Sequence, residues 1–446
     1  MAHSDSLRRS LRIVVSDYGM LLVLLAIGAY LSVVTYAEQH PTGLAAARQL
    51  AASVRQKCSD NARVLVVARN GAEDEAFAKE LKSQLESSGL RVAGVVNGEP
   101  ADARKALTAA ATEKLDAVAC HPAAASWTLF ENMARISPAL ATTQILKPES
   151  YYWPNFLKAE NLLNIANQIA VIAIVAIGMT MVVISGGIDL SVGSLIALSA
   201  VVVARLIRDY GGGTSAGTPA LLVASAAAIA LCALCGVFSA TMITRFRVPP
   251  FIVTLGVMLM AGGEARAISE GETINQVPQS FMWLGRGADL FGIPNAVVLM
   301  LVLYGAAHVV MTRTSLGRYI YAVGGNAEAA RLSGVPVRRV LLVVYAVCGA
   351  LAGLGGVILA SLFQGGSPVY GKMYELYVIA AVVVGGASLS GGEGRIFSTL
   401  IGAFIIAVIQ NGMNLTGIRS ESQEVVLGAV ILGAVILDKL KNRGVG

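Results

Sequence analysis

Charged residues are scarce in this sequence of 446 residues. Asp, Glu, Lys and Arg make up only 14% of the chain, whereas hydrophobic residues make up 55% and the mean hydropathy is +0.66. Soluble domains carry about 25% charged residues. A long chain with so few charges cannot cover its apolar surface in water, so the composition excludes an ordinary soluble protein and predicts one embedded in a lipid bilayer.

Histidine and cysteine are also rare. The four histidines are scattered without the spacing of a metal site, and five cysteines are too few for a disulfide framework. No Gly-x-Ser-x-Gly elbow stands between a strand and a helix. The net charge of +6 does not indicate a nucleic-acid partner, because the basic residues stand mostly at the ends of apolar runs. We therefore expect no cofactor, no metal and no catalytic centre in this chain.

Long apolar runs dominate the rest of the sequence, and helices are expected because lipid-facing segments must satisfy their own backbone hydrogen bonds. About ten spans are predicted, at roughly 18–37, 162–184, 190–208, 219–242, 250–268, 293–312, 338–361, 373–388, 396–412 and 423–438. The first run follows several arginines, as a signal peptide does. It is long enough to span and no convincing cleavage site follows, so we expect an uncleaved first helix.

The distribution of basic residues predicts that both termini are cytoplasmic. With the N-terminus inside, the inner segments carry Arg8, Arg9, Arg12, Arg245, Arg247, Arg313, Arg318, Arg331, Arg338, Arg339, Arg395, Lys439, Lys441 and Arg443. The outer segments, omitting residues 41–146, carry Lys147, Lys158, Arg205, Arg208, Arg266, Arg286, Lys372 and Arg419. The omission follows from the rule itself, because long translocated segments do not obey it.

One polar region, residues 41–150, interrupts the apolar pattern. Strands are predicted at Arg63–Ala68, Arg91–Val96 and Asp116–Cys120, and helices at Glu73–Ser88 and Ala101–Lys114. Strands that alternate with helices of this length predict a parallel sheet. The expected fold is therefore an all-α polytopic membrane protein with a small α/β domain. Its parts are residues 1–40 with the first helix, an extracytoplasmic domain at 41–150, and a transmembrane domain at 151–446.

A short glycine-rich stretch, Ile184–Ser194 (ISGGIDLSVGS), joins two of the apolar runs. Asp189 is the only charged residue between Glu160 and Arg205, and an ionisable group at membrane depth is costly and usually functional. Ser191 is a candidate cap for the helix that follows. We expect a broken helix pair that shapes a path or gate through the membrane. The alternative is that Asp189 caps the next helix in water at the inner surface.

This stretch has a weak internal sequence repeat later in the chain. Gly186–Ser191 reads GGIDLS and Gly385–Ser390 reads GGASLS, and each lies between two successive spans. An internally repeated transporter leaves such a pattern.

The inner loop at 312–339 contains a short capped helix. Asn326 is a candidate N-cap, Ala327–Leu332 a short helix, Gly334 its terminator, and Pro336 prevents continuation. A small-residue helix of this kind suits docking into a cytoplasmic partner. An ordinary loop helix at the membrane surface is the equally weighted alternative.

From about Pro154 to Lys441 the chain resembles the permease subunits of ribose- and xylose-type ABC sugar importers, within the binding-protein-dependent transport permeases. The stretches that carry the resemblance are Gly178-Met179-Thr180 with GGIDLSVGS, then VPPFIVTLG, AVGGNAEAARLSGV and VVVGGASLSGGEG. The resemblance implies cytoplasmic ATPase subunits, an extracytoplasmic solute-binding protein and a second permease copy or a paralogue. It places coupling to the ATPase at Gly324, Gly325, Asn326, Ala330, Ser333 and Gly334.

The expected function is therefore import of a monosaccharide or similar small polar solute across the bacterial inner membrane by alternating access. The candidate residues of the path are Gly187, Asp189, Ser191, Phe251 and Thr254. The last two follow a Pro-Pro pair, which interrupts or starts a helix. Two readings from other classes stay open: an ion-coupled secondary transporter, and a membrane sensor that uses the external domain. The sequence does not identify the solute.

Two motifs imitate nucleotide sites. Leu389–Glu393 (LSGGE) looks like the ABC ATPase signature, and Gly366, Gly371 and Lys372 match the start of a P-loop. A P-loop needs Ser or Thr next, but Met373 follows. We therefore expect ATP hydrolysis in a partner subunit.

The segment at 41–150 departs from the family pattern, which has a short connection there. Its stretches RVLVVARNGAEDEAFAKEL, SSGLRVAGVVNGEPADARKAL and LDAVACHP are similar to the first lobe of sugar-binding periplasmic proteins. It is too short for two lobes, so partner docking, ligand binding and a structural role all remain open. If it is exported, Cys58 and Cys120 are candidates for a disulfide.

Overall fold

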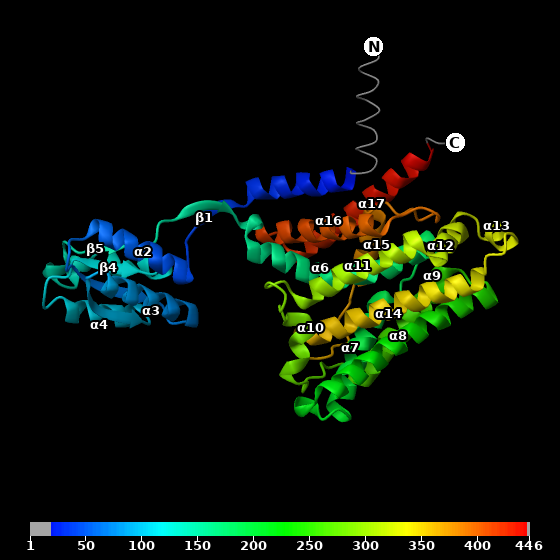
Figure 1. The fold of residues 1–446 in the computed structure, drawn as a ribbon, viewed down its shortest axis with the longest axis horizontal. Coiled ribbons are helices and arrows are strands. Elements are labelled where there is room, and N and C mark those ends of the chain that lie inside the picture. Colours follow the sequence, from blue (N-terminus) through cyan, green and yellow to red (C-terminus); the bar gives the residue numbers. More distant parts are fainter. Residues whose placement is uncertain (1–18, 444–446) are drawn as a thin grey trace, which may run out of the picture. The chain divides into compact units, whose positions relative to one another are not determined.

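The computed structural model describes residues 19–443, with side chains up to residue 436. The chain is mostly helical and divides into two compact units, Tyr36–Pro154 and the remainder (Figure 1). The basic residues Arg8, Arg9 and Arg12 of the orientation argument lie outside the described residues. So do the side chains of the C-terminal Lys439, Lys441 and Arg443.

The unit Tyr36–Pro154 is built on a four-stranded parallel sheet with the strand order β3-β2-β4-β5. Its strands are β2 (Arg63–Ala68), β3 (Arg91–Asn97), β4 (Ala117–Cys120) and β5 (Gln144–Leu146). Its helices are α2 (Gly43–Lys57), α3 (Ala72–Ser87), α4 (Pro100–Ala110) and α5 (Pro122–Ala125). The first three strands and the helices α3 and α4 lie where the apolar patterns predict them. The helix α2 and the strand β5 were not predicted.

Helices cover both faces of this sheet, so β2 is buried on both sides and reads as a continuous apolar run. On one face, Val64 and Val66 pack with Leu50 of α2 and Phe77 of α3. The opposite face belongs to a second core, which contains Leu107 of α4.

A two-stranded antiparallel ribbon closes this unit. Strand β1 (Tyr36–Gln39) pairs with β6 (Tyr151–Pro154). The unit therefore begins and ends a few residues outside the bounds of 41 and 150 that composition indicates. Hydrophobicity does not reveal the ribbon, because its register is a pairing between residues more than 100 positions apart.

The other unit is a helical bundle. Its helices are Gly19–Val34, α6 (Ala159–Ile184), α7 (Val192–Asp209), α8 (Thr218–Phe246), α9 (Pro250–Ser269), α10 (Trp283–Arg286), α11 (Asn295–Arg313), α12 (Ser315–Gly325), α13 (Ala327–Leu332), α14 (Val337–Phe363), α15 (Tyr374–Val384), α16 (Ile396–Leu415) and α17 (Ser420–Arg443). Among the described helices, six are long and apolar enough to cross a membrane: α6, α8, α9, α11, α14 and α16. The helices Gly19–Val34 and α15 are apolar but shorter.

Small residues bring α14 into close contact with its neighbours α8, α7 and α6 (Figure 1). A Cβ added at Gly353 would lie 2.9 Å from the Cα of Ile229, and one added at Gly178 of α6 would lie 2.6 Å from the Cα of Cys348. Such close backbone approach is how helices gain packing energy in lipid. The buried Cys232 thiol of α8 donates to the carbonyl of Leu195 in α7 at 3.4 Å, so this cysteine takes part in the packing of the two helices.

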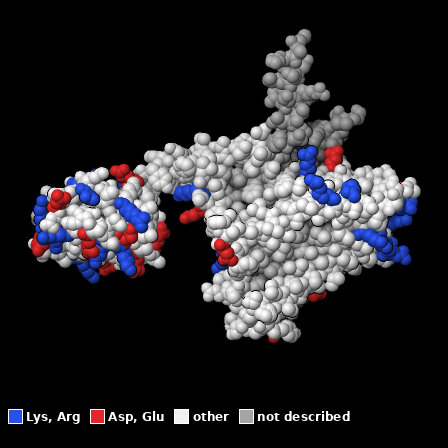
Figure 2. All heavy atoms as spheres, in the orientation of Figure 1, with Lys and Arg blue, Asp and Glu red and all other residues white. Residues whose placement is uncertain are grey.

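Charge is distributed differently over the two units. Figure 2 shows Lys, Arg, Asp and Glu intermixed over the α/β unit, whereas the helical unit presents a mostly uncharged surface on this face. An uncharged outer surface is what lipid requires of a helical bundle.

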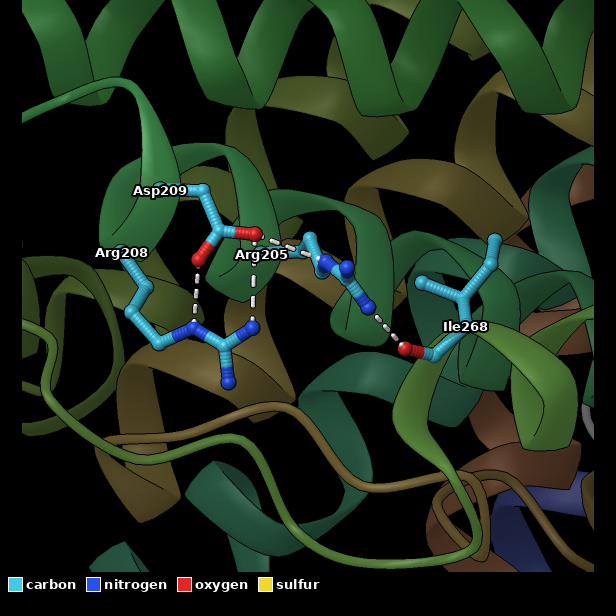
Figure 3. Close-up of polar contacts among 4 residues, drawn as sticks. All are labelled: Arg205, Arg208, Asp209 and Ile268. Carbon is cyan, nitrogen blue, oxygen red and sulfur yellow. Dashed lines mark hydrogen bonds and ion pairs between the residues drawn. The ribbon is translucent and has the colours of Figure 1, made fainter.

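The C-terminal end of α7 holds a compact ion-pair cluster (Figure 3). Asp209 accepts from Arg205 Nε at 2.8 Å and from Arg208 Nε at 2.6 Å, and Arg205 also donates to the carbonyl of Ile268 at the end of α9. Cations in the last turn of a helix interact favourably with its dipole. The cluster therefore stabilises the C-terminus of α7 and links it to α9 by a hydrogen bond.

Candidate functional site

The helix α6 ends in a tight glycine turn. Gly186 has φ +82°, its N–H donates to Val183 O, and the N–H of Gly187 donates to Val182 O at 2.9 Å. A left-handed residue after the last helical turn is the usual role of glycine at a helix C-terminus. A Cβ at Gly187 would overlap the hydroxyl of Tyr345 in α14, so this position needs glycine for close approach as well.

Asp189 holds the chain between this turn and α7. Its Oδ1 accepts from the backbone N–H of Ser191 at 2.9 Å and from the Ser191 hydroxyl at 2.6 Å. The expectation that the Ser191 hydroxyl accepts from the helix backbone is wrong, because that hydroxyl donates to Asp189 instead. Asp189 is fully buried, so its carboxylate is not a cap that sits in water.

The surroundings of Asp189 are polar but incompletely paired. Among the described residues, neither its Oδ2 nor the hydroxyl of Tyr345 has a hydrogen-bond partner. Both Tyr345 and Cys348 of α14 lie close to the carboxylate. Buried polar atoms without partners are rare and often mark functional positions.

The first turn of α9 contacts the non-helical segment between α6 and α7. Thr254 is fully buried, and its hydroxyl lies 3.3 Å from the carbonyl of Ile188 and 3.1 Å from that of Pro250. The Phe251 side chain is 52% exposed. The structure thus brings Gly187, Asp189, Ser191 and Thr254 together, and it does not place the ring of Phe251 with them.

The loop between α11 and α14 contains the capped helix that the sequence predicts, α13. Asn326 Oδ1 accepts from the N–H groups of Glu328 (3.0 Å) and Ala329 (2.9 Å). At the other end Gly334 has φ +87°, and the N–H of Val335 donates to Ala330 O at 3.0 Å. Both caps are local, so the helix is defined by its own sequence.

This helix is well exposed. Leu332 is 75% exposed, whereas Ala330 is buried against the bundle. The side chains of Glu328 and Arg331 form an ion pair on the surface, and the hydrogen bonds from Arg331 lower the pKa of Glu328. A rigid helix with an exposed leucine offers a surface for a partner.

A cluster of close backbone contacts joins the turn after α6, the C-terminal end of α12 and the loop between α15 and α16. We name it the glycine junction (Gly186, Gly324, Gly325, Gly391 and Gly392). The N–H of Gly392 donates to the carbonyl of Ile184, the last residue of α6, at 2.8 Å. A Cβ at Gly324 would overlap that same carbonyl oxygen. A Cβ at Gly391 would lie 2.7 Å from Gly324 O and 3.1 Å from the Cα of Gly186.

The hydroxyl of Tyr321 reinforces the junction by donating to Gly394 O at 2.7 Å. The sequence marks Gly324 and Gly325 as coupling residues through resemblance alone. It does not reveal the contacts of Ile184, Tyr321 and Gly392, because these contacts join segments far apart in the chain.

The turns after α6 and α15 have the same hydrogen-bond pattern. The N–H groups of Gly386 and Ala387 donate to Val383 O and Val382 O, as those of Gly186 and Gly187 do to Val183 O and Val182 O. Gly386 also has a positive φ of +86°. In the structure Gly186 is therefore equivalent to Gly386. Alignment of GGIDLS with GGASLS pairs Gly186 with Gly385 instead, so the two differ by one residue.

The two imitations of nucleotide motifs have other roles in the structure. Leu389–Glu393 forms the loop between α15 and α16, where Ser388 N donates to Glu393 O and Gly391 contributes to the glycine junction. Gly366, Gly371 and Lys372 lie in a non-helical segment between α14 and α15. Neither stretch is a phosphate loop that opens a helix after a strand.

In the α/β unit, a polar cluster lies at the carboxyl ends of the neighbouring strands β2 and β4. The helices that follow these two strands pack on opposite faces of the sheet. Asp74 Oδ2 accepts from Arg69 at 3.2 Å, and its Oδ1 lies 3.4 Å from Nε2 of His121. Burial lowers the pKa of His121. Such switch points are where open α/β sheets bind ligands, but here the three side chains face one another.

The cysteines of this unit are not joined. Both thiols are free, and they belong to different cores: Cys58 packs with the cluster around α2 and α3, and Cys120 lies in the cluster around α4. Cys58 and Cys120, the candidates for a disulfide, are therefore separated by the sheet in the structure.

We expect both thiols to be alkylated without prior reduction. Burial raises the pKa of Cys58 and Cys120, which lowers the reactive thiolate fraction, and Cys120 is fully buried. Cys58 should therefore react slowly in the native protein and Cys120 only after unfolding, as peptide mass spectrometry can follow. Alkylation of either thiol that required a reductant would contradict the structure.

Comparison with known proteins assigns most of the helical unit. Residues 161–435 match the family described as branched-chain amino acid transport system / permease component. The ribose import permease protein RbsC of Escherichia coli (strain K12) is 44% identical over 293 residues, which cover 65% of this chain and 88% of that protein. The Bacillus subtilis (strain 168) RbsC is 40% identical over 312 residues, covering 70% and 94%.

A third relative is the D-allose transport system permease protein AlsC of Escherichia coli (strain K12). It is 35% identical over 288 residues, which cover 65% of this chain and 86% of that protein. No solved structure matches the chain.

Proposed function

Because the chain belongs to the family of branched-chain amino acid transport system permease components, we propose that it is the permease subunit of an ATP-driven importer for a monosaccharide or similar small polar solute. The relatives are named as permeases for ribose, D-allose and L-arabinose. The observation that carries the mechanism is the glycine junction. It connects the exposed, capped helix α13 to the turn after α6 through backbone contacts.

In this proposal a cytoplasmic ATPase subunit docks on α13, with Asn326 and Gly334 fixing the ends of the helix. Motion of α13 passes through Gly324 to Ile184 and Gly392, because these backbones are in direct contact. The turn held by Asp189 and Ser191 then shifts relative to α9 and α14. An extracytoplasmic binding protein delivers the solute, and alternating access follows from rigid-body movement of the helices.

The ten apolar segments, rather than the six long helices alone, are proposed to be the membrane crossings. All ten segments contain a helix. The charge distribution favours cytoplasmic termini and an extracytoplasmic position for residues 41–150. That segment lies outside the family match at 161–435, and its mixed surface charge suits docking of a partner. A second copy of the chain or a paralogue completes the permease pair.

Uptake driven by ATP separates this proposal from an ion-coupled transporter. In right-side-out vesicles that contain the chain, its ATPase and its solute-binding protein, we expect accumulation of radiolabelled D-ribose, D-allose or L-arabinose to require ATP inside the vesicles. Ionophores that collapse proton and sodium gradients should leave it unchanged at constant ATP. Uptake that followed an ion gradient, or solute binding by residues 36–154 without any transport, would replace the proposal by the transporter or the sensor.

A further inference from the structure

The segment Gln364–Met373, between α14 and α15, crosses part of the bundle without helical structure. The helix α15 that follows has 11 residues, which at 1.5 Å per residue gives about 16 Å. The hydrocarbon core is about 30 Å thick. The helix therefore covers roughly half of a crossing, and the segment before it is a series of turns, with hydrogen bonds from Tyr370 N to Ser367 O and from Lys372 N to Val369 O. Hydropathy alone predicts that Gln364–Met373 is an outer loop.

The segment runs antiparallel beside α7. A Cβ at Gly366 would overlap the carbonyl oxygen of Ala200, and one at Gly371 would lie 2.5 Å from Gly193 O and 2.9 Å from the Cβ of Ile196. As the chain advances from Gly366 to Gly371, its contact on α7 moves back toward the first turn of that helix. The segment thus descends along α7 from its middle to its N-terminus.

The long helix α14 (Val337–Phe363) serves as a depth marker for this descent. Ile196, in the second turn of α7, approaches Gly356, twenty residues into α14, and the Ser199 hydroxyl donates to the carbonyl of Gly353. The start of α7, one turn before Ile196, therefore lies near the middle of α14. Gly371, in contact with Gly193, lies at the same depth.

Two helix N-termini therefore meet near the middle of the bundle. The carboxylate of Glu375, in the first turn of α15, lies against Gly193 in the first turn of α7. The first N–H groups of each helix have no intrahelical partner, and helix N-termini favour negative or oxygen-bearing groups. Helices that begin inside the membrane are the usual surroundings of a transporter's solute site.

The exposed side chains of this segment decide what it faces. Val369 is 66% exposed, and Lys372 is also exposed. Non-helical backbone at membrane depth is tolerated only where it is buried in protein or lines a water-filled space. A lysine facing hydrocarbon is costly. Lipid is thus an unfavourable neighbour on two grounds, and water suits the charged side chain.

We propose that Gln364–Met373 lines the water-filled path of the solute, with Lys372 directed to it. The ammonium group donates three hydrogen bonds, which suits the hydroxyl oxygens of a neutral polyhydroxylated solute. The rings of Phe363, the last residue of α14, and Tyr370 lie 5.2 Å apart and offer an apolar surface beside the segment. This inference rests on the proposed function and adds path residues that are distinct from Asp189 and Thr254.

Cysteine labelling in membrane vesicles tests this inference. Val369→Cys and Lys372→Cys are compared with Val302→Cys, a residue of α11 that is 62% exposed and thus matched to Val369. The reagent is a charged, water-soluble methanethiosulfonate, and the labelled peptides are read by mass spectrometry so that native thiols do not interfere. We expect both segment positions to react at least about tenfold faster than Val302→Cys, because a charged reagent is excluded from hydrocarbon.

The transported sugar should also slow this reaction. Whichever of D-ribose, D-allose or L-arabinose the vesicles accumulate is added at saturation, and labelling of Lys372→Cys should fall severalfold. Reaction of Val369→Cys no faster than Val302→Cys would overturn the inference and indicate that lipid or a second permease copy covers the segment. Sugar uptake by the unsubstituted chain is measured in parallel. Loss of uptake there refutes the proposed function, whereas slow labelling with intact uptake refutes only the path.

Discussion

Gly324→Ala should reduce solute uptake by at least about tenfold, whereas alanine at the adjacent Gly325 should leave uptake close to that of the unsubstituted chain. The Cβ at position 324 would overlap the carbonyl oxygen of Ile184 and lie 2.6 Å from Gly392 N. Both neighbours are backbone atoms, so no side-chain rotation can relieve the contact. Overpacking of this kind costs about 1–3 kcal/mol, and 1.4 kcal/mol corresponds to tenfold.

Gly325 is a matched control because a Cβ there meets no atom within 4 Å. Both variants are compared by initial rates of sugar uptake and by thermal unfolding of the detergent-solubilised complex. A loss of uptake in Gly324→Ala with little change in unfolding would assign the effect to coupling, and a lower unfolding temperature would assign it to packing. Normal uptake by Gly324→Ala would show that the backbone contact with Ile184 is not required.

Bulkier residues at Gly325 and Gly334 test a different surface. They lie at the two ends of the docking helix, where added volume faces a partner or, at Gly334, also strains a residue with φ +87°. The sequence predicts that such variants insert normally and lose coupling. Normal uptake would remove α13 from the coupling route.

The second large effect is expected at Asp189. Asp189→Ala removes the acceptor of two hydrogen bonds from Ser191 and leaves that N–H buried without its partner. Hydrogen bonds to a charged group are worth about 1.5–3 kcal/mol. We therefore expect a lower unfolding temperature and a loss of uptake of about tenfold or more.

Asp189→Asn is the informative control, because an amide oxygen can still accept both hydrogen bonds from Ser191. It also removes a charge whose Oδ2 has no hydrogen-bond partner among the described residues. Stability of this variant should equal or exceed that of the unsubstituted chain, with most uptake retained. If Asp189→Asn lost as much uptake as Asp189→Ala, the negative charge itself would be required and the positional role would be wrong.

The sequence predicts those parts of the structure that depend on local pattern. The helix α13 follows from Asn326 and Gly334 alone, and both caps form as expected. The strand β2 follows from an apolar run that must be buried on both faces. The break at Gly186 follows from glycines beside a lone Asp189.

Several of the missed features depend on contacts between distant segments. The ribbon of β1 and β6 and the hydrogen bond of Gly392 to Ile184 each join residues more than 100 positions apart. The non-helical segment before α15 has the hydropathy of a loop, and only its contacts with Gly193 and Ala200 show that it enters the bundle. The candidate pair Cys58 and Cys120 belongs to two different cores, which the sequence does not reveal.

Simultaneous measurement of sugar uptake and ATP hydrolysis in proteoliposomes tests the account most directly. The vesicles contain the permease, its ATPase subunit and its solute-binding protein. The account predicts that the unsubstituted chain accumulates sugar only while ATP is hydrolysed, and that Gly324→Ala hydrolyses ATP with little accumulation. Accumulation that continued with a hydrolysis-deficient ATPase subunit would contradict it.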